Sequence, residues 1–145
     1  MPSGNEDAVG LRLGTTSPYE QRFGYSRVVR VGPLAMTAGC TASVDGVVRS
    51  PGDAAAQAAV AFGVGLDALA RVGVRAEAVI ATRMYIVDAR DADGVGLVHG
   101  EVFGRVRPAA TMVVVAGLID PAMLVEVELT ARGVPLCPLS SGGRQ

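Results

Sequence analysis

Two runs of sequence decide the fold: Arg107-Pro108-Ala109-Ala110-Thr111-Met112-Val113-Val114-Val115-Ala116-Gly117-Leu118 and Leu124-Val125-Glu126-Val127-Glu128-Leu129. Both are rich in β-branched and other apolar residues, which favour extended strands. Asp120-Pro121 lies between them and has the composition of a turn. We therefore expect two strands linked by a turn, from Ala110 to Ala116 and from Leu124 to Arg132.

The second of these strands alternates apolar and acidic residues. Successive side chains of a strand point to opposite faces, so Val125 and Val127 share one face, and Glu126 and Glu128 share the other. Two interpretations of the acidic face stay open. It is a solvated surface, or it lies at a contact between subunits, where Arg83 on another strand neutralises one carboxylate.

Strands are also expected near the start of the chain, from Tyr25 to Val31 and from Leu34 to Cys40, with turns at Gly32-Pro33 and Asp45-Gly46. A helix over residues 51–72 follows, with Ser50 as its N-cap and proline at its first position. Its core-facing stripe has helical spacing and consists of Ala55, Ala58, Phe62, Leu66 and Leu69.

A strand from Val79 to Val87 comes next, and we expect one of its faces to carry Val79, Ala81, Arg83, Tyr85 and Val87. A second helix over about residues 90–104 ends at Gly104. The order of elements indicates an α+β domain, with a mixed β-sheet and both helices on one sheet face.

Composition sets limits on assembly and partners. The 145 residues fit one domain, and 50% hydrophobic content with a mean hydropathy of +0.38 exceeds what one small core needs, which favours burial between subunits. A net charge of −1 without a basic cluster argues against nucleic acid or an anionic membrane as partner. The chain has no lysine, which excludes Schiff-base chemistry by a side-chain amine.

The ends of the chain and its cysteines indicate the compartment. We expect a flexible arm over residues 1–16, one domain over 17–132 and a flexible tail over 133–145. Residues 1–18 lack the pattern of a secretory signal, and Asp67 and Arg71 interrupt the longest apolar run. Cys40 and Cys137 form no Cys-x-x-Cys pair, so reduced thiols in a cytoplasmic protein are expected.

The pattern around Pro108 and the Glu-x-Glu of residues 126–128 resembles the Rid family, also called the YjgF family. The resemblance covers about residues 17–132. Its other motifs are Ser17-Pro18-Tyr19-Glu20, Gly24-Tyr25-Ser26-Arg27, Thr37-Ala38-Gly39-Cys40, Asp53-Ala54-Ala55-Ala56-Gln57, Arg83-Met84-Tyr85 and His99-Gly100-Glu101-Val102-Phe103-Gly104. It implies the chorismate-mutase-like fold, assembled as a homotrimer whose inter-subunit clefts act on reactive enamines and imines.

The resemblance also implies site residues. Glu126 corresponds to the glutamate proposed to hold the hydrolytic water. Substrate contacts are implied for Tyr19, Gly39, Ala110, Thr111 and Arg83. At Ala110, however, the deaminating members have an arginine that binds the substrate carboxylate. Its loss removes a bidentate contact of roughly 1.5–3 kcal/mol, so the chain resembles the branches that lack this arginine.

Two further residues are candidates for catalysis, each with a structural alternative. Cys40 is a nucleophile or a small buried thiol, and the sequence places no activating base beside it. His99, the single histidine, is a general base or a packed helix residue. One histidine and two separated cysteines do not form a usual zinc site, and no cofactor motif occurs, so neither metal nor cofactor is expected.

Two functions remain open. The first is an enzyme that acts without a cofactor on a small imine, enamine or carbonyl compound, as a hydrolase, deaminase, tautomerase or cyclase, and is not a standard 2-imino acid deaminase. The second is a trimer that binds a small ligand or a partner without turnover. In both, the partner is a small molecule held in a cleft between subunits.

Overall fold

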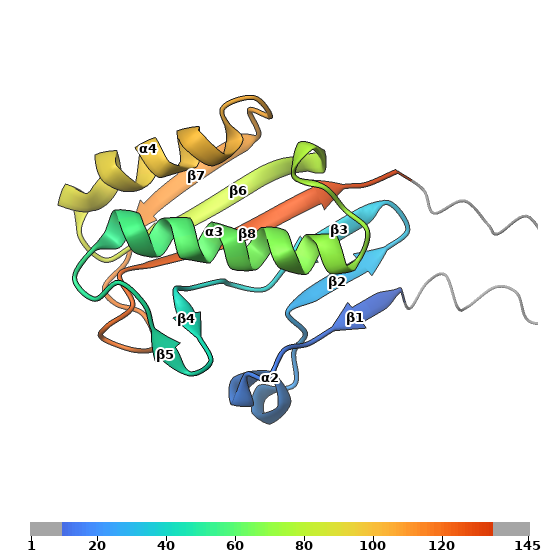
Figure 1. Ribbon diagram of the computed structural model, residues 1–145, viewed down its shortest axis with the longest axis horizontal. Coiled ribbons are helices and arrows are strands. Elements are labelled where there is room, and N and C mark those ends of the chain that lie inside the picture. Colours follow the sequence, from blue (N-terminus) through green and yellow to red (C-terminus); the bar gives the residue numbers. More distant parts are fainter. Residues whose placement is uncertain (1–9, 135–145) are drawn as a thin grey trace, which may run out of the picture.

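The computed structural model describes residues 10–134. Its centre is a six-stranded sheet with the strand order β1-β2-β3-β8-β6-β7 (Figure 1). All neighbours are antiparallel except β6 and β7, which are parallel. The strands are β1 (Leu11–Leu13), β2 (Val28–Val31), β3 (Leu34–Thr37), β6 (Val79–Ile86), β7 (Ala109–Val114) and β8 (Val125–Arg132). The mixed sheet predicted from the sequence is confirmed.

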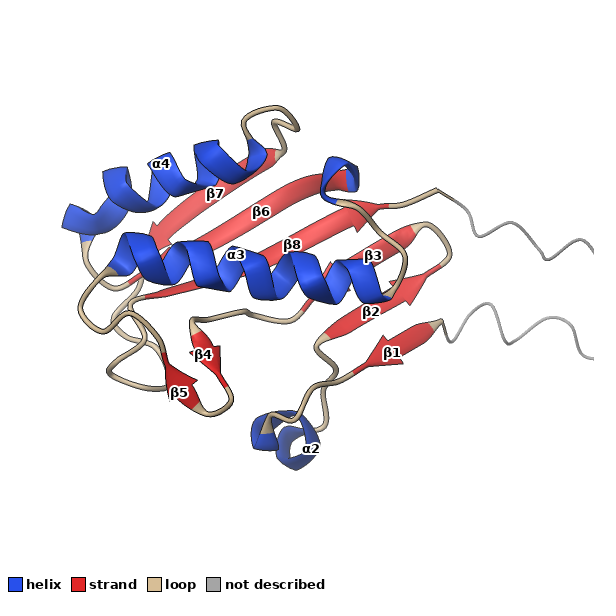
Figure 2. Ribbon diagram, viewed as in Figure 1, coloured by secondary structure: helices blue, strands red, loops and turns tan. Residues whose placement is uncertain are grey.

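Two helices, α3 (Ala54–Arg71) and α4 (Ala92–Phe103), cover the same face of the sheet (Figure 2). Helix α4 connects β6 to β7, because two parallel strands need a crossover connection. The core between helices and sheet includes Phe62, Leu69, Ile86 and Phe103, all at most 1% exposed. The predicted α+β layers are therefore confirmed, with both helices on one face.

The smaller elements lie at the edges of these layers. A separate hairpin joins β4 (Ser43–Val44) to β5 (Val47–Val48), and Asp45 and Gly46 at its turn both have positive φ. The expected Asp45-Gly46 turn is confirmed. Two 3₁₀ helices, η1 (Ala76–Ala78) and η2 (Ala89–Asp91), precede β6 and α4. No helix in the described part of the chain is long and apolar enough to cross a membrane.

The start of α3 corrects the sequence prediction. The N-cap is Asp53, whose carboxylate accepts a hydrogen bond from the Ala56 N–H at 3.0 Å, and the helix begins at Ala54. Ser50 has φ +52 and lies in a turn with Pro51, so it caps nothing. The Ser50-Pro51 pair indicated a helix start at residue 51. The side chain of Asp53, three residues after Ser50, is the one that accepts a hydrogen bond from a free N–H of the first turn. The other strand and helix ends lie within a few residues of their predicted positions.

The face prediction for Val79 is also wrong. The pairing of β6 with β8 is irregular between Val79 and Ala81, so the alternation of faces slips by one residue at Ile80. Val79 is consequently buried under the helices, whereas Ile80 is 51% exposed. Arg83 and Tyr85 do share the face that the helices leave open, because their neighbours Thr82, Met84 and Ile86 are buried.

The first part of the chain contains structure that the sequence did not predict. β1 pairs with β2 inside the stretch expected to be a flexible arm, and a short helix, α2 (Pro18–Phe23), follows it. The three residues of β1 are too few to show the alternation typical of a strand. Their extended conformation depends on pairing with β2. Most of the expected C-terminal tail lies outside the described residues. Its first residues are held by Arg30, which donates a hydrogen bond to the Val134 carbonyl.

Strand β8 confirms the alternation read from its sequence. Val125, Val127 and Leu129 are buried under the helices, whereas Glu126 and Glu128 are half-buried on the opposite side. We call this opposite side, which neither α3 nor α4 covers, the open face. It brings the acidic pair of β8 beside β3 and β6, which flank this strand.

Candidate active site on the open sheet face

The centre of the site is the contact between Glu126 and Gly39. The Glu126 carboxylate packs directly on the Cα atom of Gly39: a Cβ atom at that position would lie 2.8 Å from Glu126 Cδ and closer still to its Oε1. A side chain at residue 39 therefore cannot coexist with the present position of Glu126. The glycine is required by close approach, since its φ is not in the positive range.

An irregular pairing of β3 with β8 makes this contact possible. Met36 pairs with Thr130, but Cys40 bridges Val127, so three residues on one side face only two on the other. This bulge puts Gly39 over Glu126. The displaced Leu129 N–H donates to the Thr37 hydroxyl at 3.1 Å instead of to a carbonyl.

The same bulge leaves the Gly39 N–H free. Within residues 10–134 it donates no hydrogen bond, although the flanking Ala38 and Cys40 amides donate to Arg27 O and Val127 O, at 2.9 and 2.8 Å. Gly39 is half-buried. The site therefore presents an unpaired backbone donor beside a carboxylate, an arrangement that can bind a polar group of a small ligand.

Burial and a like charge tune the Glu126 carboxylate. Burial raises the pKa of Glu126, and the neighbouring Glu128 raises it further, while the charge of Arg27 opposes both effects. On the adjacent strand, Tyr85 pairs with Glu126, and its hydroxyl donates to Glu128 Oε1 at 2.5 Å. This hydrogen bond raises the pKa of Tyr85. Glu126 is thus a stronger base than a solvated carboxylate.

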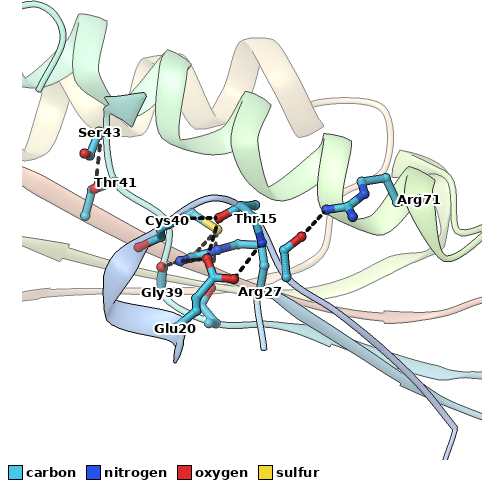
Figure 3. Close-up of polar contacts among 11 residues, drawn as sticks. Thr15, Glu20, Arg27, Gly39, Cys40, Thr41, Ser43 and Arg71 are labelled. Carbon is cyan, nitrogen blue, oxygen red and sulfur yellow. Dashed lines mark hydrogen bonds and ion pairs between the residues drawn. The ribbon is translucent and has the colours of Figure 1, made fainter. Parts of the chain in front are cut away.

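Arg27 lies behind Gly39 and ties it to the N-terminal segment (Figure 3). Its guanidinium donates to the Gly39 carbonyl, contacts Cys40 Sγ at 3.8 Å, and forms an ion pair with Glu20 at 3.3 Å. Thr15 holds Glu20 in turn, through its N–H at 2.7 Å and its hydroxyl at 2.5 Å. Arg27 was not among the predicted site residues, because one arginine before an apolar strand has no distinctive pattern.

Cys40 pairs with Val127, the neighbour of Glu126, but its side chain lies on the opposite side of the sheet, in the core. Its side chain is fully buried and donates a weak hydrogen bond to the Ala38 carbonyl at 3.3 Å. It faces α3, where a Cβ atom on Gly65 would lie 3.7 Å from Sγ. Burial raises the pKa of the Cys40 thiol despite the nearby Arg27. This placement fits the structural interpretation of Cys40.

His99 also lies on the helix side of the sheet. Its Nε2 shares a 2.8 Å hydrogen bond with the Thr82 hydroxyl, and its ring packs against Phe62 and Phe103. Burial lowers the pKa of His99, so the imidazole is neutral near pH 7. The ring borders a hollow of about 260 Å³ that Gly100, Phe103, Gly104, Arg107 and Pro108 complete.

Ala110 lies next to this hollow and far from Glu126 in the sheet. It pairs with Thr82, which binds His99, and it is exposed on the edge strand β7 (Figure 1). Strand β6 separates β7 from β8. The predicted site residues therefore lie in two separate regions of the chain, which we call the acidic half-site (Gly39 and Glu126) and the edge half-site (Ala110 and the His99 hollow).

The other expected contact residues are distributed over both regions. Tyr19, on α2, is 42% exposed and stacks on Phe23. Thr111 and Arg83 are paired neighbours on the open face, and Arg83 also pairs with Glu128. No group of side chains in the described ranges could hold a metal ion.

The fold and this site define the class of the protein. The sequence profile of the Endoribonuclease L-PSP family matches residues 16–133, so the chain belongs to this family, which includes the YjgF proteins. An uncharacterized protein of Streptomyces coelicolor is 42% identical over 120 residues, 83% of this chain and 90% of that protein.

Solved structures agree with this assignment. Rv2704 from Mycobacterium tuberculosis, a member of the YjgF/YER057c/UK114 family, has a TM-score of 0.77 and 39% identity over 84% of this chain and 98% of its own. TdcF of E. coli with bound serine has a TM-score of 0.69 and 21% identity, with 83% of this chain and 92% of its own covered. At that identity the likeness is one of fold.

Proposed function

We propose that the protein is a homotrimer that acts on a small imine, enamine or carbonyl compound in clefts between subunits. The observation that carries this proposal is the half-buried Glu126 carboxylate, with a raised pKa, beside the unpaired N–H of Gly39. Such a carboxylate is a base of useful strength, and the amide is a donor for charge that develops on a substrate atom.

The open face supports the assembly. It exposes large apolar side chains around the acidic pair, with Leu34 45%, Met36 46% and Val113 42% exposed. Covering these side chains with another copy removes apolar surface from water. Packing between copies is also what would join the edge half-site of one subunit to the acidic half-site of the next, since a single chain keeps Ala110 and Glu126 on different strands.

Glu126 has a defined part in the proposed hydrolysis of a C=N bond. The carboxylate accepts a proton from water as the water oxygen bonds to the imine carbon, the π electrons of the C=N bond move to nitrogen, and the nitrogen takes the proton that Glu126 now carries. The resulting carbinolamine expels ammonia and leaves the carbonyl product. The Gly39 N–H would stabilise negative charge on the substrate during the addition.

Ala110 supports a substrate other than the common 2-imino acids. A methyl group offers no bidentate contact to a carboxylate, so small amino-acid-derived imines would bind roughly ten- to a hundredfold more weakly than with arginine there. The serine bound to E. coli TdcF indicates that the fold accommodates small polar metabolites. A nuclease activity is less consistent with the net charge of −1.

The alternative is a trimer that binds a small ligand without turnover. The loss of the cation at residue 110 favours it, because catalysis needs the substrate held in one orientation while binding does not. The two functions differ in one respect that can be measured. Exchange of Glu126 for glutamine abolishes turnover in an enzyme but leaves ligand affinity nearly unchanged in a binding protein.

The test uses 2-aminoacrylate-derived imine and three forms of the protein. We expect weak or no acceleration by the natural protein, and a gain of imine hydrolysis in Ala110→Arg that is lost again in Ala110→Arg with Glu126→Gln. Size-exclusion chromatography identifies variants that no longer assemble. An Ala110→Arg protein that assembles, binds no small 2-oxo acid and shows no activity would refute the proposed cleft.

A further inference from the structure

Arg27 is a buried cation that the hydrolytic scheme above does not use. Its side chain is 10% exposed and lies between the Glu20 carboxylate and the Gly39 carbonyl (Figure 3). Its Cζ atom is 5.9 Å from the centroid of the Tyr25 ring. An arginine this deeply buried needs several partners. One of its partners, the carbonyl of Gly39, belongs to the residue that packs against Glu126.

The partners of Arg27 divide into one charged group and two neutral ones. Hydrogen bonds from Thr15 and the charge of Arg27 lower the pKa of Glu20 against the opposing effect of burial, so Glu20 is ionised. The Cys40 thiol stays neutral, and the Gly39 carbonyl carries only a dipole. The positive charge of Arg27 is thus balanced from the α2 side, while on the β8 side it lies behind the Gly39 peptide on which the Glu126 carboxylate packs.

We propose that Arg27 is a positioning residue of the Glu126 site. It fixes the Gly39 carbonyl, and so the bulge over which Glu126 lies, and it places a buried positive charge, partly balanced by Glu20, behind that carboxylate. The role of Arg27 in catalysis rests on the proposed function. Its effect on the position and charge of Glu126 does not depend on turnover of a substrate.

The neighbours of Glu126 make a clear electrostatic test possible. Two charges act on Glu126: Glu128 on the same strand raises its pKa, and Arg27 lowers it. On β6, Tyr85 donates to Glu128, and Arg83 pairs with Glu128. Removing the Arg27 charge leaves the repulsion by Glu128 unopposed by Arg27. Removing the Glu20 charge leaves Arg27 unbalanced. The first change should raise the pKa of Glu126, and the second should lower it. A general loosening of the fold by either change would shift that pKa in the same direction.

The experiment is a carbon-13 NMR titration of the glutamate carboxyl carbons in the assembled protein, with the Glu126 signal assigned by its loss in Glu126→Gln. We expect the Glu126 midpoint to shift upward in Arg27→Met and downward in Glu20→Gln. The double variant should fall between the two single ones. Arg22→Met, an exposed arginine of α2 that stacks on Phe23, serves as the matched control and should leave the midpoint unchanged.

Two results would overturn the assignment: shifts of the same sign in Arg27→Met and Glu20→Gln, or no shift in either. If Arg27→Met does not fold, Glu20→Gln and the charge-retaining Arg27→Lys still decide, because Glu20→Gln must lower the midpoint and Arg27→Lys must leave it close to that of the natural protein. The titration needs no substrate. The expected shifts in a protein whose assembled Ala110→Arg form binds no small 2-oxo acid and gains no imine hydrolysis would therefore contradict the proposed function and leave the positioning role intact.

Discussion

Gly39 and Glu126 occupy positions that exclude any side chain at residue 39, since a Cβ atom there would lie 2.8 Å from Glu126 Cδ. We expect Gly39→Ala to push the carboxylate aside and to lower stability by about 1 kcal/mol, the low end for overpacking, because the atoms it meets end a flexible side chain. Chemical denaturation measures this loss. In the matched control Gly63→Ala, the new methyl group has open space on α3, so a gain of up to about 1 kcal/mol is expected.

A double variant separates this clash from a general defect of the bulge. Glu126→Ala removes the carboxylate that the new methyl group would meet, so combining it with Gly39→Ala should recover most of the lost stability. Additive losses in the double variant would show that Gly39 is needed for the backbone alone.

Gln57 is expected to control where β8 begins. It is fully buried in α3, its Nε2 donates to Ala122 O at 2.9 Å, and its Oε1 accepts from the Leu124 N–H at 2.9 Å. Gln57→Leu would leave both backbone groups without partners, which costs about 3 kcal/mol. Thermal or urea unfolding measures the loss, and the exposed Gln21→Leu should change stability by no more than about 0.5 kcal/mol.

Glu126 is expected to make stability fall as pH rises. Burial raises its pKa in the folded protein above the unfolded value near 4.5, so the folded state binds the proton more tightly. The contribution of Glu126 to the free energy of unfolding is therefore complete below about pH 4.5. It is lost as pH rises through the pKa of Glu126 in the folded protein. Unfolding of natural protein and Glu126→Gln at one concentration, from pH 4 upward, measures the difference. A difference that does not change with pH would contradict the raised pKa.

The layers of the fold were predictable because they follow from periodicity. The alternation of Val125, Glu126 and Val127 set both faces of β8, and the stripe containing Phe62 set the buried side of α3. The slip at Ile80 was not predictable, since no residue marks it and the partner strand β8 imposes it. The cap at Asp53 was available in the sequence, but the Ser50-Pro51 pair offered a competing start.

The candidate site was predictable only in part. The residues implied by the family resemblance included Gly39 and Glu126, and the structure brings these two into contact. It does not bring His99 or Ala110 to them within one chain, because β6 and the sheet itself lie between. Arg27 was missed because its role depends on a bulge and on the burial of Glu20, neither of which leaves a periodic signal.

We propose that further copies of the chain cover the open face and so complete the cleft. Sedimentation velocity at micromolar concentration tests it, and we expect a species of three 14.8 kDa chains. Met36→Glu, which puts a charge on the open face, should dissociate that species while circular dichroism stays unchanged; Leu97→Glu, at an exposed position of α4, should not. A natural protein that sediments as a monomer, or a Met36→Glu variant that remains trimeric, would contradict this assembly.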